Sequence, residues 1–196
     1  MRNYFLIATM AAILIPASSQ AGAIITLPSV SANAGDVNDS FDVLLVYSGV
    51  PISAAGFAFE ITTSDPDITF TDATTGTSTG YIFAGSSVFG PDIVTTPPGQ
   101  TLDASDIGGA TLVTGSYGLG HVFYAVAANA TPGTFAITLT VNGTSMSDPN
   151  ATPISVSLSN GSITISSVPE PSSLALVFSA ICGIAALRFG IERSRS

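Results

Sequence analysis

Hydrophobic and polar residues alternate along most of the chain between residues 24 and 166. The alternating segments are 41–47, 57–61, 68–70, 122–126, 135–141, 154–158 and 163–165. Successive side chains of a strand point to opposite faces of a sheet, so a period of two is typical of half-buried strands. Turn signals separate these segments, namely Gly49-Val50-Pro51, Pro132-Gly133, Asn142-Gly143 and Asn160-Gly161. The pattern predicts an all-β fold, a single antiparallel β-sandwich of the jelly-roll type over residues 24–166.

The stretch from Thr74 to Ser116 is rich in Gly, Thr, Ser and Pro, and its alternation is weak. Strands are expected at 81–83 and 87–89. The remainder is expected to form a long excursion over one face of the sandwich. A binding role would be placed there, because loops carry function more often than the scaffold does.

Residues 1–23 have the order of a secretory signal peptide. Arg2 precedes a short apolar run, and Pro16 ends that run before a stretch of small residues. Cleavage is expected after Ala21 or after Ala23, because both cuts place small side chains at the two positions that the peptidase reads. The alternative is an uncleaved membrane anchor or a buried helix, which the shortness of the run disfavours.

Three features stand in a fixed order at the C-terminal end. Residues 167–173 form a linker that contains Pro169-Glu170-Pro171, residues 174–191 are apolar except for Arg188, and residues 192–196 are a basic tail. As a helix, the apolar segment measures about 27 Å, enough to cross a hydrocarbon core if Arg188 reaches the head groups. We expect a transmembrane helix with a cytoplasmic tail. The prolines keep the linker extended outside the membrane.

This order resembles the PEP-CTERM sorting signal of bacteria, whose Pro-Glu-Pro motif is matched by Pro169, Glu170 and Pro171. The resemblance implies recognition by an exosortase, a membrane transpeptidase. Such an enzyme cuts near the motif, removes the helix and passes the protein to the cell surface or extracellular matrix. A permanent single-pass anchor with a proline-rich stalk is the alternative, because the physics of membrane spanning does not distinguish the two.

Charge narrows the classes of ligand that the domain can bind. The chain has no Lys, and its four Arg are residues 2, 188, 193 and 195, so the predicted domain carries no permanent positive charge. Nucleic-acid binding is excluded, because nothing would neutralise the phosphates. Divalent cations, neutral glycans and basic partners remain electrostatically permitted.

The inventory of catalytic groups is small. His121 is the only histidine, and the only cysteine, Cys182, lies in the apolar C-terminal segment, so the domain has no disulfide and no zinc ligand set. No Gly-x-Ser-x-Gly elbow accompanies His121. Two acid pairs have the composition of a glycosidase pair: Asp65/Asp67 and Asp103/Asp106. Both pairs are expected in turns, where Asp forms local hydrogen bonds, so no catalytic residue is predicted.

Two ligand sites are suggested by residue type. A structural calcium ion is the one cofactor considered, and its hard oxygen ligands would come from Asp36, Asn38, Asp39 and Asp42, although their spacing matches no EF-hand loop. Sugar-binding modules stack aromatic rings against pyranose rings. Trp is absent, so the candidate sugar contacts are Tyr81 and Tyr117, with ordinary packing as the alternative role for both.

The order of strand and turn signals is similar to that of cohesin domains, which are related to carbohydrate-binding modules. The residues that carry this likeness are Ala34-Gly35-Asp36, the stretch 55–61 with Ser64-Asp65-Pro66, the stretch 131–135, and the stretches 147–150 and 159–163. The resemblance implies a jelly-roll sandwich used for adhesion or scaffolding. Dockerin binding is not carried over, because the region 74–116 departs from the pattern.

These features predict a non-enzymatic protein that is exported, sorted and displayed at the cell surface or in the extracellular matrix. Its processing partners would be signal peptidase and an exosortase, and its C-terminal helix would contact the membrane. The domain would then bind an extracellular polysaccharide or another surface protein. The first alternative is a carbohydrate-binding module that recognises exopolysaccharide, and the second is a hydrolase that uses carboxylates.

Overall fold

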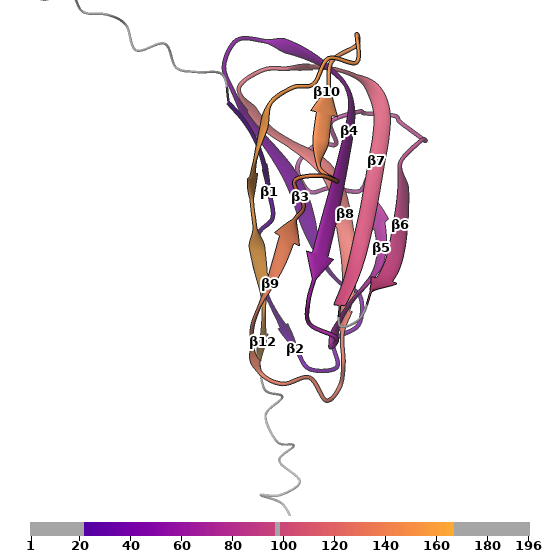
Figure 1. Ribbon diagram of the computed structural model, residues 1–196, viewed down its shortest axis with the longest axis vertical. Coiled ribbons are helices and arrows are strands. Elements are labelled where there is room, and N and C mark those ends of the chain that lie inside the picture. Colours follow the sequence, from indigo (N-terminus) through magenta and orange to yellow (C-terminus); the bar gives the residue numbers. More distant parts are fainter. Residues whose placement is uncertain (1–21, 97–98, 167–196) are drawn as a thin grey trace, which may run out of the picture.

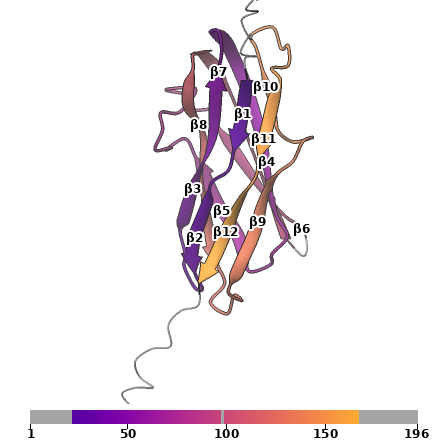
Figure 2. The ribbon, with the colours of Figure 1, turned by 90° about the vertical axis from the view of Figure 1, so that its left-hand side faces the viewer.

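The computed structural model describes residues 22–96 and 99–166, which form a sandwich of two β-sheets (Figures 1 and 2). All the regular secondary structure of these residues is β. The strands are β1 (Gly22–Thr26), β2 (Ser29–Asn33), β3 (Asp39–Ser48), β4 (Ile52–Thr63), β5 (Ile68–Thr74), β6 (Gly90–Thr96), β7 (Gly99–Leu112), β8 (Gly115–Val126), β9 (Gly133–Leu139), β10 (Ser145–Ser147), β11 (Val156–Ser159) and β12 (Gly161–Ser166). The predicted all-β sandwich is therefore confirmed for the described residues.

The two layers have different strand orders. Sheet A runs β11-β1-β3-β8-β5, and sheet B runs β2-β12-β9-β4-β7-β6 with β10 paired to β4. Figure 2 shows the two layers side by side. Strand β1 begins at one end of the sandwich and β12 ends at the other (Figure 1).

The core lies between the sheets and is built by the alternating segments. In β3, Phe41, Val43, Leu45 and Tyr47 are all buried, and the neighbouring positions are more exposed. Strands β4 and β8 follow the same rule. The largest fully buried side chains are Tyr124, Phe59, Ile25, Leu45, Ile61, Ile68, Leu102, Leu112, Leu119, Ile137 and Ile163. The period-two prediction is thus correct for these strands, because each places every second side chain in the core.

The sheets are not purely antiparallel, which corrects the expectation from sequence. Strand β1 pairs with β11 in parallel in sheet A, and β2 pairs with β12 in parallel in sheet B. Among its several crossings between the sheets, the chain passes from sheet A to sheet B between β1 and β2 and again between β11 and β12. Asn160-Gly161 lies at the second crossing and does not close a hairpin, since its flanking strands belong to different sheets.

The expected long excursion over 74–116 is wrong in its second half. Strands β6 and β7 occupy residues 90–96 and 99–112, and β7 pairs with β4 along most of its length. Its buried side chains Leu102, Ala104 and Leu112 are separated by small and polar residues, which weakened the alternation. Residues 75–89 form a loop, and the strands expected there at 81–83 and 87–89 are absent apart from one bridge between Tyr81 and Gly118.

Most of the terminal segments that are predicted to direct export and sorting lie outside the described residues. This holds for most of the predicted signal peptide (1–23) and for the whole of the predicted linker 167–173, the predicted transmembrane helix 174–191 and the predicted tail 192–196. Within 22–96 and 99–166, no helix has the length and apolar character needed to cross a membrane.

Candidate functional site

The outer face of sheet B carries a row of three carboxylates, one from each of three neighbouring strands. Glu60 of β4 is the register partner of Asp103 of β7, and Asp103 is the register partner of Asp92 of β6. Register partners present their side chains on the same face, with Cβ atoms about 4.5–5.5 Å apart. The sequence neighbours Phe59 and Leu102 are buried, so the acids point away from the core. We call Glu60, Asp92 and Asp103 the carboxylate row.

A surface cavity of about 310 Å³ opens beside the carboxylate row. Asp92, Asp103, Ser105 and Gly143 contribute to its wall. At the border of the cavity, the hydroxyl of Thr140 donates a hydrogen bond to Glu60 Oε1. Carboxylates make strong, charge-assisted hydrogen bonds with ammonium and guanidinium groups. The cavity therefore has the size and polarity to receive a cationic side chain.

The carboxylate row is electrostatically strained. Burial raises the pKa of Asp103, and the neighbouring Glu60 carboxylate, followed by Asp92, raises this pKa further. No Lys or Arg occurs between residues 3 and 187, so no fixed positive charge in the domain offsets the repulsion. A bound cationic group would supply the missing charge.

Sequence reasoning missed the carboxylate row. Glu60 lies 32 residues before Asp92 in the chain, and Asp92 lies 11 residues before Asp103, so only the strand register brings the three acids together. One signal was available, since Thr101, Asp103 and Ser105 alternate with the apolar Leu102 and Ala104. That alternation would have placed Asp103 on the outer face of a strand.

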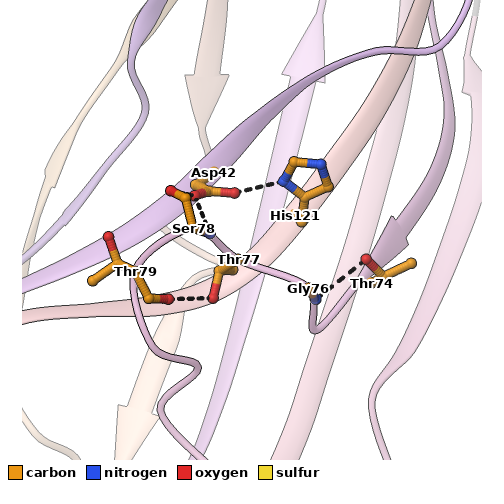
Figure 3. A network of polar contacts seen from close by, with 7 residues as sticks. All are labelled: Asp42, Thr74, Gly76, Thr77, Ser78, Thr79 and His121. Carbon is orange, nitrogen blue, oxygen red and sulfur yellow. Dashed lines mark hydrogen bonds and ion pairs between the residues drawn. The ribbon is translucent and has the colours of Figure 1, made fainter.

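The outer face of sheet A carries a different polar network, drawn in Figure 3. Asp42 of β3 and His121 of β8 are register partners, and Asp42 Oδ1 lies 2.6 Å from His121 Nδ1. The backbone N–H of Ser78 donates to Asp42 Oδ2 at 2.8 Å, and the Ser78 hydroxyl donates to the same oxygen. Residues 76–79, which we call the strap, are thereby fastened across β3 and β8.

A close approach to β8 holds the strap from its other end. A Cβ atom on Gly118 would lie 2.0 Å from Thr77 Oγ1, so only glycine leaves room for the strap here. Just beyond the strap, Gly118 accepts a hydrogen bond from Ile82 N at 2.9 Å and donates one to the Gly80 carbonyl at 3.0 Å. Part of the outer face of sheet A is therefore covered by the chain itself.

Ser78, Asp42 and His121 do not form a catalytic triad. In a triad the imidazole lies between the hydroxyl and the carboxylate, because it must take the hydroxyl proton. Here the carboxylate lies between the other two groups (Figure 3). Burial by itself would raise the pKa of Asp42, but the hydrogen bonds from Ser78 and His121 outweigh it and lower this pKa. The ionised Asp42 thus acts as an acceptor that fixes the strap.

The candidate sugar contact Tyr81 is engaged inside the protein. Its hydroxyl donates to Asp106 Oδ2 at 2.6 Å, and Asp106 is only 2% exposed. The ring packs edge-on against Phe57 and Phe89. Burial raises the pKa of Tyr81 strongly, and Asp106 raises it further. This tyrosine anchors the loop 75–89 to β7.

Tyr117 lies on β8 beside Gly118, the residue that forms the bridge with Tyr81, and its hydroxyl is also engaged. It accepts a hydrogen bond from Val113 N at 2.8 Å and donates one to the Val113 carbonyl at 2.9 Å. Among the described residues, the ring of Tyr81 packs against Phe57 and Phe89 rather than beside the ring of Tyr117.

The two acid pairs are arranged differently from each other. Asp65 and Asp67 do lie in a turn, where Asp65 Oδ1 accepts from Asp67 N at 2.8 Å. Asp103 and Asp106, however, lie in β7, which corrects their expected place in a turn. Asp103 faces outward and Asp106 faces the core, where it accepts from Ser86 Oγ at 2.8 Å and from its neighbour Ile107 N. Two carboxylates on opposite faces of a strand cannot flank one glycosidic bond.

The residues of the candidate calcium site are partly committed to other contacts. Asp42 belongs to the strap network, and Asp36 Oδ2 accepts two hydrogen bonds from Asn33. Burial and the charge of Asp36 raise the pKa of Asp39, and Asn38 adopts a φ of 69°. Among residues 22–96 and 99–166, no cluster of three or more His, Cys, Asp or Glu side chains is placed to hold a metal ion.

The sorting motif Pro169-Glu170-Pro171 and the cleavage residue Ala21 lie outside the described residues. Ala23, the alternative cleavage residue, lies in β1. It is 5% exposed and is the register partner of both Tyr47 and Val156.

A scan against protein-family models and a search of curated proteins both found no match. Solved cohesin structures do match the fold. The seventh type I cohesin of ScaB from Pseudobacteroides cellulosolvens has a TM-score of 0.60 at 11% identity, over 76% of this chain and 96% of that one. A type I cohesin–dockerin complex with OlpA from Clostridium thermocellum has a TM-score of 0.57 at 15% identity, over 74% and 99%.

A third neighbour is CaCohA2 from Clostridium acetobutylicum, with a TM-score of 0.55 at 20% identity over 74% of this chain and 91% of that one. Each of the three structures matches about three quarters of this chain, and each is itself covered almost completely. The described residues therefore have the fold of cohesin domains.

Proposed function

We propose that this chain is a non-enzymatic adhesion or scaffolding protein whose domain binds another protein through the outer face of sheet B. The observation that carries the proposal is the carboxylate row beside its cavity on an open sheet face. Part of the opposite face is already covered by the strap. The partner surface would present Lys or Arg to Glu60, Asp92 and Asp103.

Apolar side chains flank the carboxylate row and would provide contact area. Ile107 of β7 is 72% exposed, and Val94 of β6 lies two residues from Asp92 on the same side of its strand. Interfaces commonly combine a few apolar anchors with charged groups that set specificity. A partner with a basic patch that contains one or two apolar side chains would fit this surface.

The cohesin fold supports a binding role. A cohesin from Clostridium thermocellum was solved as a cohesin–dockerin complex, and so was one from Acetivibrio cellulolyticus. A shared sandwich does not fix the ligand, because one architecture hosts many functions. We carry over only the class of activity, which is protein binding, and not the identity of the partner or the surface that binds it.

Export and sorting complete the proposal. The signal peptide and the Pro169-Glu170-Pro171 segment would bring the domain to the cell surface or the extracellular matrix through signal peptidase and an exosortase. Signal-peptidase cleavage after Ala21 is favoured over cleavage after Ala23. The first cut would leave β1 whole from Gly22, whereas the second would remove Gly22 and the buried Ala23.

Exopolysaccharide binding through Tyr81 and Tyr117 stays a prediction with less support. Both hydroxyls are engaged within the protein, and the Tyr81 ring is half-buried against other aromatic side chains. The alternative of a hydrolase that uses carboxylates loses support, because the side chains of Asp103 and Asp106 face opposite ways and cannot act as a pair.

The test is affinity capture from the host's extracellular protein fraction with the mature protein as bait. We compare the wild type with the double variant Glu60→Gln/Asp103→Asn, which keeps the shapes of the side chains but removes two charges. The wild type should retain a basic protein that is released as salt rises, because exposed ion pairs are screened. The double variant should lose most of that capture.

The matched control is Asp65→Asn/Asp67→Asn, which removes the same charge from a turn remote from the carboxylate row. This control should capture as the wild type does. Equal capture by all three proteins would contradict the proposed binding face.

A further inference from the structure

Strand β6 is the edge strand of sheet B, and among the described strands it pairs only with β7 (Figure 1). Its register runs from Gly90 opposite Ser105 to Thr96 opposite Gly99. The third of the seven pairs in this ladder is Asp92 opposite Asp103. The attachment of β6 therefore depends on a ladder that contains a pair of like charges.

The second like-charge pair adjoins the first. Asp103 also lies opposite Glu60 of β4, so its carboxylate has an acidic neighbour on each side. Like charges directly opposite each other weaken strand pairing. When all three groups are ionised, Asp103 is repelled from both neighbouring strands.

No other described charge relieves this repulsion. Strand β5 packs near β6 and β7. Its charged residue, Asp72, is itself acidic and accepts a hydrogen bond from Ala73 N, so it supplies no positive charge. The turn between β9 and β10 contributes only the Thr140 hydroxyl, which donates to Glu60. The single histidine of the chain, His121, lies in sheet A.

We propose that the carboxylate row is a proton-operated latch on edge strand β6. With all three acids ionised, repulsion loosens β6 from β7. A proton taken up by the Asp103–Glu60 pair removes the repulsion on both sides and allows these two groups to hydrogen-bond, so β6 closes onto β7. Acidic surroundings therefore order this edge of the sheet.

The direction of the titration agrees with this geometry. Burial, and then Glu60 and Asp92, raise the pKa of Asp103 above its ordinary value. An acid whose pKa is raised in the folded state binds its proton more readily folded than unfolded. The folded state therefore gains stability as pH falls through the folded pKa of Asp103, and the gain is complete below the unfolded pKa near 3.8.

Because β6 borders the proposed binding face, the latch would also regulate binding there. That consequence rests on the proposed function, whereas the latch itself does not. If the pH effect on β6 is observed but no partner is captured, the latch is supported and only the proposed binding face is contradicted.

The experiment is hydrogen exchange of the β6 amides in the mature protein, with EDTA present. We compare wild type, Asp103→Asn and Asp67→Asn at pH 7.5 and again at pH 4.5, always at equal pH. At pH 7.5, Asp103→Asn should slow exchange over residues 90–96 by about two- to fivefold for each repelling pair that it removes. At pH 4.5 the difference from wild type should shrink, because the raised pKa of Asp103 favours proton uptake by the wild type as pH falls.

Asp92→Asn is the second variant, since it lies on the exposed edge and its substitution threatens the fold least. It should slow β6 exchange at pH 7.5 by about half the effect of Asp103→Asn, measured on a logarithmic scale, because it relieves one pair. The latch would be overturned by an Asp103→Asn effect that is equal at both pH values. An equal effect of Asp67→Asn would overturn it too, since relief of net charge would then explain the result.

Discussion

A Cβ atom on Gly161 would lie 2.0 Å from the carbonyl oxygen of Pro28. The two residues meet where both ends of the domain cross from sheet A to sheet B. Leu27 N donates to the Ser159 carbonyl at 2.9 Å on the sheet A side, and Ser162 N donates to the Pro28 carbonyl at 3.3 Å on the sheet B side. The crossing therefore requires two backbones to pass within contact distance, which only glycine allows at position 161.

Gly161→Ala should destabilise the domain by about 1–3 kcal/mol, the usual cost of forcing an extra carbon into a packed site. Urea unfolding measures this loss. Gly109→Ala is the matched control, because a Cβ atom there meets nothing within 4 Å. The close approach would be refuted if both variants unfolded at the same urea concentration.

Asp42→Ala should free the strap. The variant removes the acceptor for Ser78 and the partner of His121, which should cost about 1–3 kcal/mol, since hydrogen bonds to a charged group are among the stronger ones. Limited proteolysis should cut within residues 76–79 faster than in wild type. Asp72→Ala removes the same charge from the same sheet, so comparable cleavage in that variant would argue against a specific role of Asp42.

The strap contact should also depend on pH. The hydrogen bonds from Ser78 and His121 lower the pKa of Asp42 in the folded state despite the opposing effect of burial. A lowered pKa contributes stability that is present above the unfolded value of 3.8 and is lost as pH falls through the folded pKa. The stability difference between wild type and Asp42→Ala should therefore be largest near neutral pH and shrink towards pH 3.

Tyr81→Phe should destabilise the domain by about 1–3 kcal/mol, because it leaves one oxygen of the buried Asp106 without its donor. Tyr117→Phe is the control. Its hydroxyl bonds with exposed backbone groups of Val113, which water can satisfy, so the loss there should be smaller. If Tyr117→Phe cost as much as Tyr81→Phe in urea unfolding, the buried Asp106 would not be the reason.

The intact mass of the mature protein tests the processing proposal. We expect an N-terminus at Gly22, because cleavage after Ala21 keeps β1 complete. We expect a C-terminus near Pro169 to Pro171 if an exosortase acts there. An N-terminus at Ile24 would contradict the first expectation, and an intact Ser196 would contradict the second and leave a permanent anchor.

Calcium removal should leave the melting temperature unchanged. Asp36 and Asp42 already accept hydrogen bonds from Asn33 and Ser78, and the described residues assemble no cluster of metal ligands. Thermal unfolding in calcium and in EDTA makes the comparison. A fall in Tm on chelation would restore the calcium site predicted from residues 36–42, because a ligand bound only by the folded state stabilises it.

Local pattern was enough to place most of the strands. Strand β3 could be predicted from Phe41, Val43, Leu45 and Tyr47, because the hydrophobicity of each side chain indicates whether its position is buried. The same rule failed in β7, where Gly, Ala, Ser and Thr occupy many positions and Asp106 points inward. A buried acid is invisible to a hydropathy pattern, since its burial depends on Tyr81 and Ser86 reaching it from a distant loop.

The sequence by itself determined the all-β class, the alternating core positions and the absence of Lys and Arg from the domain, and it predicts processing signals at both ends. Only the tertiary structure decided that Glu60, Asp92 and Asp103 form one row, that Asp42 bridges Ser78 and His121, and that Gly161 passes against Pro28. The reason is physical. Burial and charge belong to single residues and short segments, whereas strand register joins positions tens of residues apart, and no local pattern encodes which strands become neighbours.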